Sequence, residues 1–478
     1  MWKKISRFVP ILVIVPFIFG VTGYTMAGIS LKDAMYDSVS LYVIQQNADS
    51  TNAFTEIARW SAALVTTAAV LTLLKQATIF LYNRIISNLP DSTVLYGDEE
   101  TCKDLAARTK RCFYNGDRLI PRAKNQVIMF SHDYENLEFY QEHKEELKNR
   151  QVYLCLRDLD LSFLKTTGGT NLHVFNPDQI MARALWKQSE IHSILKAEKE
   201  RHIGIVGFDS LGQQVLNYGL LQNIFYRDQK FTYHVYGDSR FYQLNKPNFT
   251  TMNADEVIFH QKELTDELAN TEKLDLIICV EQVAFDLLEA LWIRYPEAQI
   301  YCQYSSDLKL AELMKDDCIH FYGNADDVYT LENIITEHLY AGGILLNYNY
   351  NHNGNEIAGV KALIANASAW KQARAEWAQL DEFTKGSNLA SADYLEIVQS
   401  LKQDAHYKML SDDDRDWELA ELEHVLWCRY HILSHWKYGE PADGKNKDTV
   451  RRIHKCLVPF EDLSQEDKDK DLQVIQGL

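Results

Sequence analysis

Uncharged residues fill two stretches near the beginning of the chain. Residues 8–31 contain no charged side chain, and about twenty of them would form a helix roughly 30 Å long, enough to cross the hydrocarbon of a bilayer. A second apolar run, 60–74, lies between Arg59 and Lys75, whose long side chains can reach water. This pattern predicts two membrane helices, and the connector between them, 33–47, is predicted to form a short amphipathic helix.

Cations flank the outer ends of these two runs and predict their orientation. They are Lys3, Lys4, Arg7, Lys75 and Arg84. The connector, by contrast, carries mainly acidic side chains. Because positively charged flanks stay in the cytoplasm, we expect a multi-pass membrane protein with both termini in the cytoplasm. The alternative is a cleavable signal peptide with a small-residue site at 25–27.

Two helices with a short connector are also the layout of a two-helix pore subunit. A potassium filter needs closely spaced glycines whose carbonyl groups replace the water around the ion. No glycine occurs between Gly28 and Gly97. A potassium-selective pore is therefore disfavoured, and a non-selective pore and a plain membrane anchor both stay open as interpretations.

From residue 92 onward, short apolar runs typical of strands alternate with charged stretches typical of helices. The predicted strands are 94–97, 126–130, 151–156, 172–175, 202–207, 231–236, 274–280, 299–304 and 318–322. Such alternation is typical of a parallel α/β sheet, and the pattern restarts at 202. We therefore predict two Rossmann-like units, 92–200 and 201–345, after a membrane domain at 1–91.

The second unit contains part of a dinucleotide-binding fingerprint. In a G-x-G-x-x-G turn the glycines let a pyrophosphate approach the N-terminus of a helix. Gly207 and Gly212 stand at the outer positions, but Asp209 replaces the middle glycine, and its carboxylate would repel a pyrophosphate. Asp238 stands where a ribose-binding acid belongs. We predict a scaffold without a bound cofactor, and the alternative is a nucleotide held at 207–238.

The turn G-F-x-S-x-G at 207–212, together with the strand order, resembles the nucleotide-binding domains that regulate potassium channels and transporters (the TrkA-N or RCK type). The resemblance covers roughly 92–345 and implies a tandem pair that assembles into dimers or higher rings. The first unit, with G-D-E-E-T-C at 97–102, departs most from the pattern. Ligand binding is therefore least expected there.

A cluster of cations nevertheless stands out in the first unit of this acidic chain. Its members are Lys103, Arg108, Lys110, Arg111, Arg118, Arg122 and Lys124. We favour a solvated helix face close to the membrane as its explanation. The functional alternative is contact with lipid phosphates of the inner leaflet or with an anionic ligand.

From about residue 355 helical periodicity replaces the strand-like runs, after a predicted linker and helical connector at 346–379. Three blocks follow: L-A-E-L-E-H-x-x-W-x-R-Y at 419–430, H-W-K-Y-G at 435–439 and R-x-H-x-C-L-V-P-F-x-x-L-S at 452–464. They closely resemble the hallmark blocks of the ryanodine-receptor repeat (RyR) domain. An all-α ligand-binding domain is therefore expected at 380–478.

Side chains within these blocks suit a nucleotide. Aromatic faces can stack on a base, cations can hold phosphates, and a carboxylate can accept hydrogen bonds from a ribose or an amine. The candidate ligand-binding residues are Glu423, Trp427, Arg429, Trp436, Lys437, Tyr438, Arg451, Arg452 and His454. The competing interpretation is that the tryptophans are core residues and that 454–459 shapes a turn.

The whole arrangement resembles a group of bacterial proteins that join two membrane helices, RCK-like Rossmann units and a RyR domain. The resemblance implies a ligand-gated effector of the inner membrane that responds to a nucleotide-derived messenger in conflict with phage. It also implies a homo-oligomer, either a dimer or a tetramer, because two helices cannot enclose a pore alone.

Composition excludes several other functions. A net charge of −18 argues against nucleic-acid binding, which needs a basic surface. The eight cysteines are scattered without a C-x-x-C pair, so we expect buried thiols rather than disulfides or a metal site. No P-loop, H-E-x-x-H helix or G-x-S-x-G elbow occurs, and the histidines show no metal-ligand spacing. We therefore expect no catalysis.

Two further functions stay open beside the ligand-gated effector. One is a membrane-anchored regulatory subunit of an ion transporter, with no pore of its own. The other is a nicotinamide-dependent oxidoreductase that kept Gly207 and Gly212, although Asp209 and the missing catalytic constellation argue against it.

Overall fold

The computed structural model describes most of the residues of the chain, which forms two compact units. The described residues are 9–43, 45, 52–159, 171–261, 264–271, 273–280, 285–303, 318–323, 330–352 and 357–476. Unit 1 is Met1–Pro90 and unit 2 is Asp91–Leu478. Lys3, Lys4 and Arg7, on which the predicted membrane orientation partly depends, lie outside the described residues.

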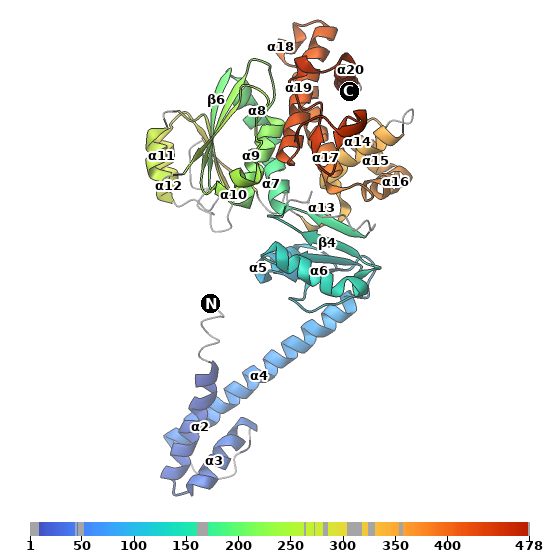
Figure 1. Ribbon diagram of the computed structural model, residues 1–478. Coiled ribbons are helices and arrows are strands. Elements are labelled where there is room, and N and C mark those ends of the chain that lie inside the picture. The colour runs from blue at the N-terminus through green and yellow to red at the C-terminus, as the bar shows by residue number, and fades with distance from the viewer. Residues whose placement is uncertain are drawn as a thin grey trace. The chain divides into compact units, whose positions relative to one another are not determined.

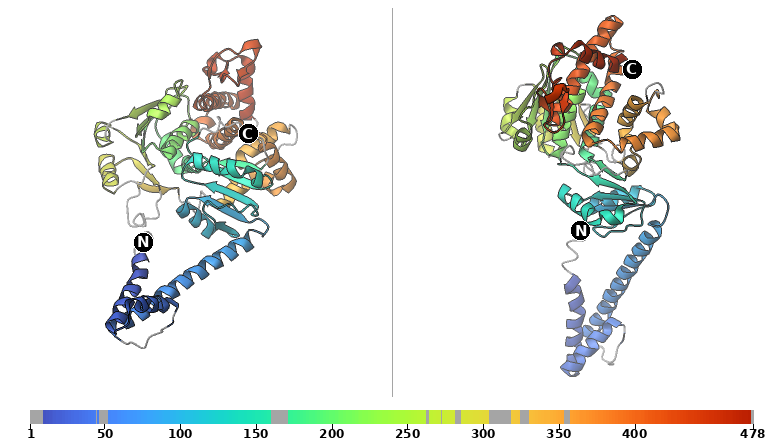
Figure 2. Two further views of the ribbon diagram at one scale, coloured as in Figure 1. Left: turned by 60° about the horizontal axis from the view of Figure 1, so that its bottom comes forward. Right: turned by 45° about the vertical axis from the view of Figure 1, so that its right-hand side comes forward.

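Unit 1 is helical (blue in Figure 1). It consists of α2 (Val9–Met26), α3 (Leu31–Ser40), the 3-10 turn η1 (Leu41–Val43) and α4 (Ala53–Ile86). Asn52 begins α4 by accepting hydrogen bonds from two backbone amides, and its side-chain nitrogen donates to the Gly23 carbonyl of α2 (2.7 Å). Ala58 and Ala62 of α4 are fully buried. Small side chains therefore let α2 and α4 lie side by side, as Figure 2 shows.

In the described part of the chain, α4 is the one helix that is long and apolar enough to cross a membrane. Its 34 residues span about 51 Å, and none of its most apolar stretch is buried. It contains the predicted apolar run 60–74 and continues well beyond it on both sides. The apolar part of α2, Val13–Met26, is shorter. A second membrane helix therefore stays a prediction.

Unit 2 contains two parallel sheets, which confirms the predicted Rossmann-like architecture. The first has the order β2-β1-β3-β4-β5. Its strands are β1 (Thr93–Gly97), β2 (Cys112–Tyr114), β3 (Asn125–Met129), β4 (Gln151–Cys155) and β5 (Leu172–Phe175). The second has the order β11-β10-β9-β6-β7-β8. Its strands are β6 (Glu200–Val206), β7 (Lys230–Tyr236), β8 (Glu256–His260), β9 (Leu276–Cys279), β10 (Gln299–Gln303) and β11 (Ile319–Tyr322).

The second order is that of the Rossmann fold, counted from β6 as 3-2-1-4-5-6 and read from β8 to β11. The first sheet has the same order without the outer third strand. The crevice where such sheets hold ligands lies at the carboxyl ends of the strands. The amino ends of the first sheet form the opposite edge.

Helices cover the sheets of unit 2 (Figure 1). They are α5 (Glu99–Arg108), α6 (Asp133–Leu147), α7 (Pro177–Trp186), α8 (Ser189–Lys196), α9 (Ser210–Gln222), α10 (Arg240–Asn245), α11 (Leu264–Asn270), α12 (Phe285–Arg294) and α13 (Leu331–Thr336). Alternate residues of each strand serve opposite faces. Ile203 and Ile205 of β6 join the core with α9, whereas Val206 joins Leu288 and Leu291 of α12 on the other face.

The rest of unit 2 is mostly helical. It contains η4 (His338–Tyr340), α14 (Ala341–Asn351), α15 (Val360–Ala365), α16 (Ala367–Trp377), α17 (Glu382–Leu401), α18 (Ala405–Lys408), α19 (Asp412–Leu433), η5 (Ala442–Gly444), η6 (Phe460–Asp462) and α20 (Gln465–Gln476). It also contains a small sheet of β12 (Lys437–Tyr438), β13 (Lys447–Asp448) and β14 (Ile453–His454). The predicted all-α domain therefore includes three short strands.

The segment predicted as a linker from 346 onward begins inside a helix. Tyr348 belongs to α14 and is buried with Trp377 of α16. The polar run around Tyr348 is helical because Tyr348 packs against α16, while Asn349 and Asn351 donate hydrogen bonds to Ile357 and Glu376. Residues 353–356 of this predicted linker lie outside the described residues.

Candidate functional site

The fingerprint turn of the second Rossmann-like unit is closed by its own side chains. Gly207 has a φ of +93°, a conformation that favours glycine. A Cβ on Gly212 would lie 2.5 Å from the Gly207 carbonyl oxygen, so this glycine is needed for close packing of α9 on the turn. Asp209 is the N-cap of α9 and accepts a hydrogen bond from the Gly212 amide at 3.0 Å. Its carboxylate therefore occupies the helix N-terminus that a pyrophosphate would use.

Asp238 is also held by a neighbour. The Arg240 guanidinium donates to it from Nε at 2.8 Å, and this contact lowers the pKa of Asp238 to about 2. The acid stands at the end of β7, as expected for a ribose-binding residue. It is paired with a cation of its own turn.

Arg429, predicted to bind a ligand, is enclosed by the second Rossmann-like unit. Its guanidinium donates at 2.6 Å to the carbonyl oxygens of Leu220 and Thr251 and to the side chains of Asn253 and Asp255. The ion pair with Asp255 is closed to water, because each side chain is only 1% exposed. Arg429 therefore holds α19 on this unit and has no free face for a ligand.

Trp436 is likewise a core residue. It is 5% exposed, packs with Cys428 and Leu457, and stacks on Phe383 with ring centroids 5.2 Å apart. Met252, from the loop before β8, packs on the same cluster. The RyR-type region and the second Rossmann-like unit thus share both an ion pair and an apolar contact.

The small sheet separates the remaining candidates by face. In its register Tyr438 lies opposite His454, and His454 lies opposite Lys447. Directly opposed residues point to the same side of a sheet. Trp427 lies on this side too, with its ring 4.8 Å from that of His454. We call Trp427, Tyr438, Lys447 and His454 the aromatic face.

Lys437 is excluded from this face by the same register. It lies opposite Ile453 and therefore points to the other side of the sheet. Arg452 has a φ of +49° and donates from Nη1 to the Ser434 carbonyl, which fixes the entry to β14. Arg451 is exposed in the preceding turn, and its backbone amide is held by Asp448.

Burial sets the charge of three titratable groups in this region. It lowers the pKa of His454 to about 4, with the charge of Lys447 adding to the effect, and that of His431 to about 3. Burial and the nearby Asp471 raise the pKa of Glu423 well above its ordinary value. Near neutral pH both imidazoles are neutral, and the raised pKa of Glu423 favours the protonated carboxyl group, which can donate a hydrogen bond. From the sequence, Glu423 was expected to accept hydrogen bonds as an ionised carboxylate.

Sequence reasoning missed Lys447 and undervalued His431. His431 lies against Trp427 with ring centroids 3.9 Å apart, and His424 stacks on the other side at 5.8 Å. Their spacing of seven residues along α19 was the available signal, because it places both on the face that carries Trp427. Among the described residues no group of three His, Cys, Asp or Glu side chains is arranged to hold a metal ion. All eight cysteines are free, and all but Cys318 are buried.

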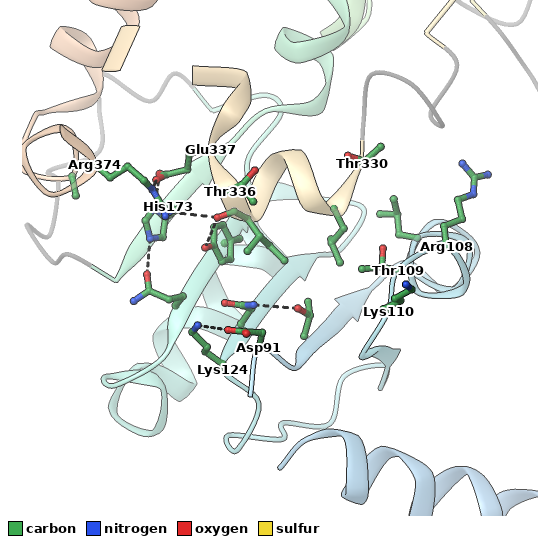
Figure 3. Close-up of a pocket in the computed structure, with 18 of the residues that line it drawn as sticks. Asp91, Arg108, Thr109, Lys110, Lys124, His173, Thr330, Thr336, Glu337 and Arg374 are labelled. Carbon is green, nitrogen blue, oxygen red and sulfur yellow. Dashed lines mark hydrogen bonds and ion pairs between the residues drawn. The ribbon is translucent and has the colours of Figure 1, made fainter. Parts of the chain in front are cut away.

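A large cavity lies elsewhere, in the first Rossmann-like unit. It has a volume of about 1290 Å³ and lies between the amino ends of β1, β3 and β4 and the helices α13 and α16. Figure 3 shows Arg374, Glu337 and His173 at one end and Arg108 and Lys110 at another. Three members of the predicted cation cluster, Arg108, Lys110 and Lys124, line it. The sequence indicated these cations but not the cavity, because α13 and α16 come from more than 200 residues further along.

Comparisons with known proteins bear on the C-terminal region. No sequence among curated proteins matches the chain. The chain is similar to a solved structure described as "Crystal structure of the GsuK bound to ADP", with 14% identity and a TM-score of 0.34 over 71% of this chain and 97% of that chain. Another, described as "GsuK Channel", has 11% identity and a TM-score of 0.32 over 67% of this chain and 80% of that chain. Residues 407–478 match the RyR domain, which confirms the expected domain type over that segment.

Proposed function

We propose that the protein is a membrane-anchored sensor whose RyR domain binds a nucleotide-derived messenger and whose N-terminal helices give the response. The observation that carries this proposal is the aromatic face within the RyR match. There Tyr438, 55% exposed, and Lys447 lie on either side of His454 in the small sheet, and the Trp427 ring contacts that of His454. An aromatic plane next to a cation suits a base and its phosphate.

The contacts of the RyR domain provide a route for the signal. α19 carries Trp427 and His431 on one side and Arg429 on the other. The Arg429 guanidinium donates hydrogen bonds to Thr251 and Asp255, in the loop that leads into β8. Met252 of that loop belongs to the same apolar cluster as Trp427 and Trp436. A ligand that binds one arrangement of α19 better than another would therefore shift the second Rossmann-like unit as well.

The response is assigned to unit 1. α4 presents an apolar surface that is not buried, and the chain passes from α4 into β1 through six residues. In this proposal the helices of several copies open or disrupt an inner membrane of a bacterium, as an effector against phage. No catalytic step is involved.

The test is dye release from liposomes that carry the full chain. Cyclic oligonucleotides, ADP-ribose and cyclic ADP-ribose are added in turn, and binding is measured separately by calorimetry on the solubilised chain. Tyr438→Ala should weaken binding of the active compound roughly tenfold to a hundredfold, since losing a stacking ring costs about 1–3 kcal/mol. It should leave the maximal release unchanged. Trp436→Ala is a poorer test, because Trp436 belongs to the core.

Tyr350→Ala is the matched control. Tyr350 is 82% exposed on α14, so its loss changes composition equally but leaves the aromatic face intact. If none of these compounds binds, the sensor assignment fails. Binding without dye release would instead support a regulatory subunit anchored beside a transporter.

A further inference from the structure

The cavity of the first Rossmann-like unit lies at the amino ends of the strands. The usual ligand crevice lies at their carboxyl ends, on the opposite edge of the sheet. Thr93, Asn125 and Gln151, which line the cavity, are the first residues of β1, β3 and β4. Ligands of such sheets bind at the carboxyl ends. This cavity is thus no remnant of a dinucleotide site, and its walls need an explanation of their own.

The walls are positively charged in a strongly acidic protein. Five lysines and arginines line the cavity: Arg108, Lys110, Lys124, Lys371 and Arg374. Among the described residues that line the cavity two are carboxylates, Asp91 and Glu337, so the lining has a formal charge of +3 within a chain of −18. A concave surface of one sign concentrates ions of the other. The cavity is therefore suited to an anion.

Two of these cations make no ion pair among the described residues. Lys124 pairs with Asp91, Arg108 with Asp104 at 2.6 Å, and Arg374 with Glu337 at 2.6 Å. Lys110 and Lys371, by contrast, have no carboxylate partner among the residues that the structure describes. Lys371 lies one helical turn before Arg374 on α16 and so shares its face.

A strained residue holds the other side of the cavity in place. Glu337 has a φ of +59°, which is uncommon for a residue with a side chain. In this conformation its buried carboxylate contacts His173 Nδ1 at 2.8 Å as well as Arg374 Nε. Burial alone would raise the pKa of Glu337, but His173 and Arg374 hold it below its ordinary value. The ionised carboxylate therefore fixes Arg374 at the edge of the cavity.

We propose that this cavity binds a small molecule carrying two or more phosphate charges, with Lys110 and Lys371 as its principal ligands. Lysine is a common point-charge partner of phosphate. Lys110 comes from the turn between α5 and β2 and Lys371 from α16, which are distant in sequence, so such a ligand would tie α16 to the first Rossmann-like unit. The phosphates could belong to a free anion or to a lipid headgroup, and the experiment separates these sources. The site is independent of the RyR domain and of the function proposed above.

The experiment is calorimetry on the full solubilised chain. Sodium pyrophosphate tests the free anion, and short-chain phosphatidic acid tests the headgroup, with short-chain phosphatidylcholine as the blank. Lys110→Ala/Lys371→Ala should weaken binding of whichever probe binds at least tenfold. Binding should also weaken as salt rises, because the attraction is between charges.

The control removes the same charge elsewhere. Lys144 of α6 and Lys408 of α18 are exposed and lie outside the cavity. Lys144→Ala/Lys408→Ala should change binding less than twofold. The proposal is overturned if neither probe binds, or if both double variants weaken binding equally. Melting temperatures of the variants show whether each remains folded.

Discussion

The Arg429 guanidinium is surrounded by acceptors of the second Rossmann-like unit, and its ion pair with Asp255 is closed to water. Removing one partner of such a pair leaves the other buried without compensation. We therefore expect Arg429→Ala to lower the free energy of unfolding by about 3–5 kcal/mol. Denaturant unfolding of the solubilised chain measures this change.

A second ion pair between the same regions provides the comparison for Arg429. Arg227 contacts Glu421 at 2.7 Å, but its side chain is about half exposed. Arg227→Ala should cost only about 0–1 kcal/mol. Arg429→Met with Asp255→Leu should restore much of the stability, since apolar side chains can replace a buried pair. Equal losses for Arg429→Ala and Arg227→Ala would contradict the structural role.

Asp209 has two effects at a single position, because it caps α9 and places a negative charge where a pyrophosphate would lie. We expect the natural chain to give no saturable heat with NADH in calorimetry. Asp209→Gly should bind NADH more tightly than the natural chain and cost only roughly a few tenths of a kcal/mol in stability, because glycine is tolerated as a cap. Micromolar binding by the natural chain would revive the oxidoreductase interpretation.

At the scale of elements, buried strands were the most predictable part of the fold. All nine predicted strands occur, because a strand covered on both faces is a continuous apolar run. The strands β2 and β8 were missed. β2 has only three residues, and β8, at the edge of its sheet, has only three apolar residues between Glu256 and His260.

The candidate site was less predictable than the fold, because burial of a side chain depends on distant segments. Trp436 and Arg429 have the residue types of a nucleotide site, yet Phe383 and Asp255 cover them. The three short strands that bring Tyr438 and Lys447 to His454 are too brief to leave a periodic pattern. The sequence identified the domain type but not which side chains face outward.

Across unit 2, buried neutral histidines make stability sensitive to acid. Burial lowers the pKa of His234 to about 4, with His260 and His202 adding to the effect, and the pKa values of His431 and His454 are lowered as well. Below pH 6.5 an unfolded chain takes up protons that these folded groups resist. Stability present above pH 6.5 is therefore lost progressively as pH falls toward 4. Glu423, Glu421 and Asp158, whose pKa values are raised by burial, act in the opposite direction.

The measurement is the melting temperature of the full solubilised chain between pH 7 and pH 5. It should fall, and the fall should be smaller in His234→Gln than in the natural chain. His338→Gln, at an exposed position, should keep the natural slope. If His234→Gln shows an unchanged slope, His234 does not contribute to the acid sensitivity.

The short connection between α4 and β1 has a mechanical consequence. β1 is hydrogen-bonded to β2 along one side and to β3 along the other. A strand at the rim of a sheet can peel away alone, whereas an inner strand can move only if its neighbours move too. Tension on α4 would therefore act on all the strands of the first sheet together. We expect this sheet to move as one rigid body and not to lose β1 alone.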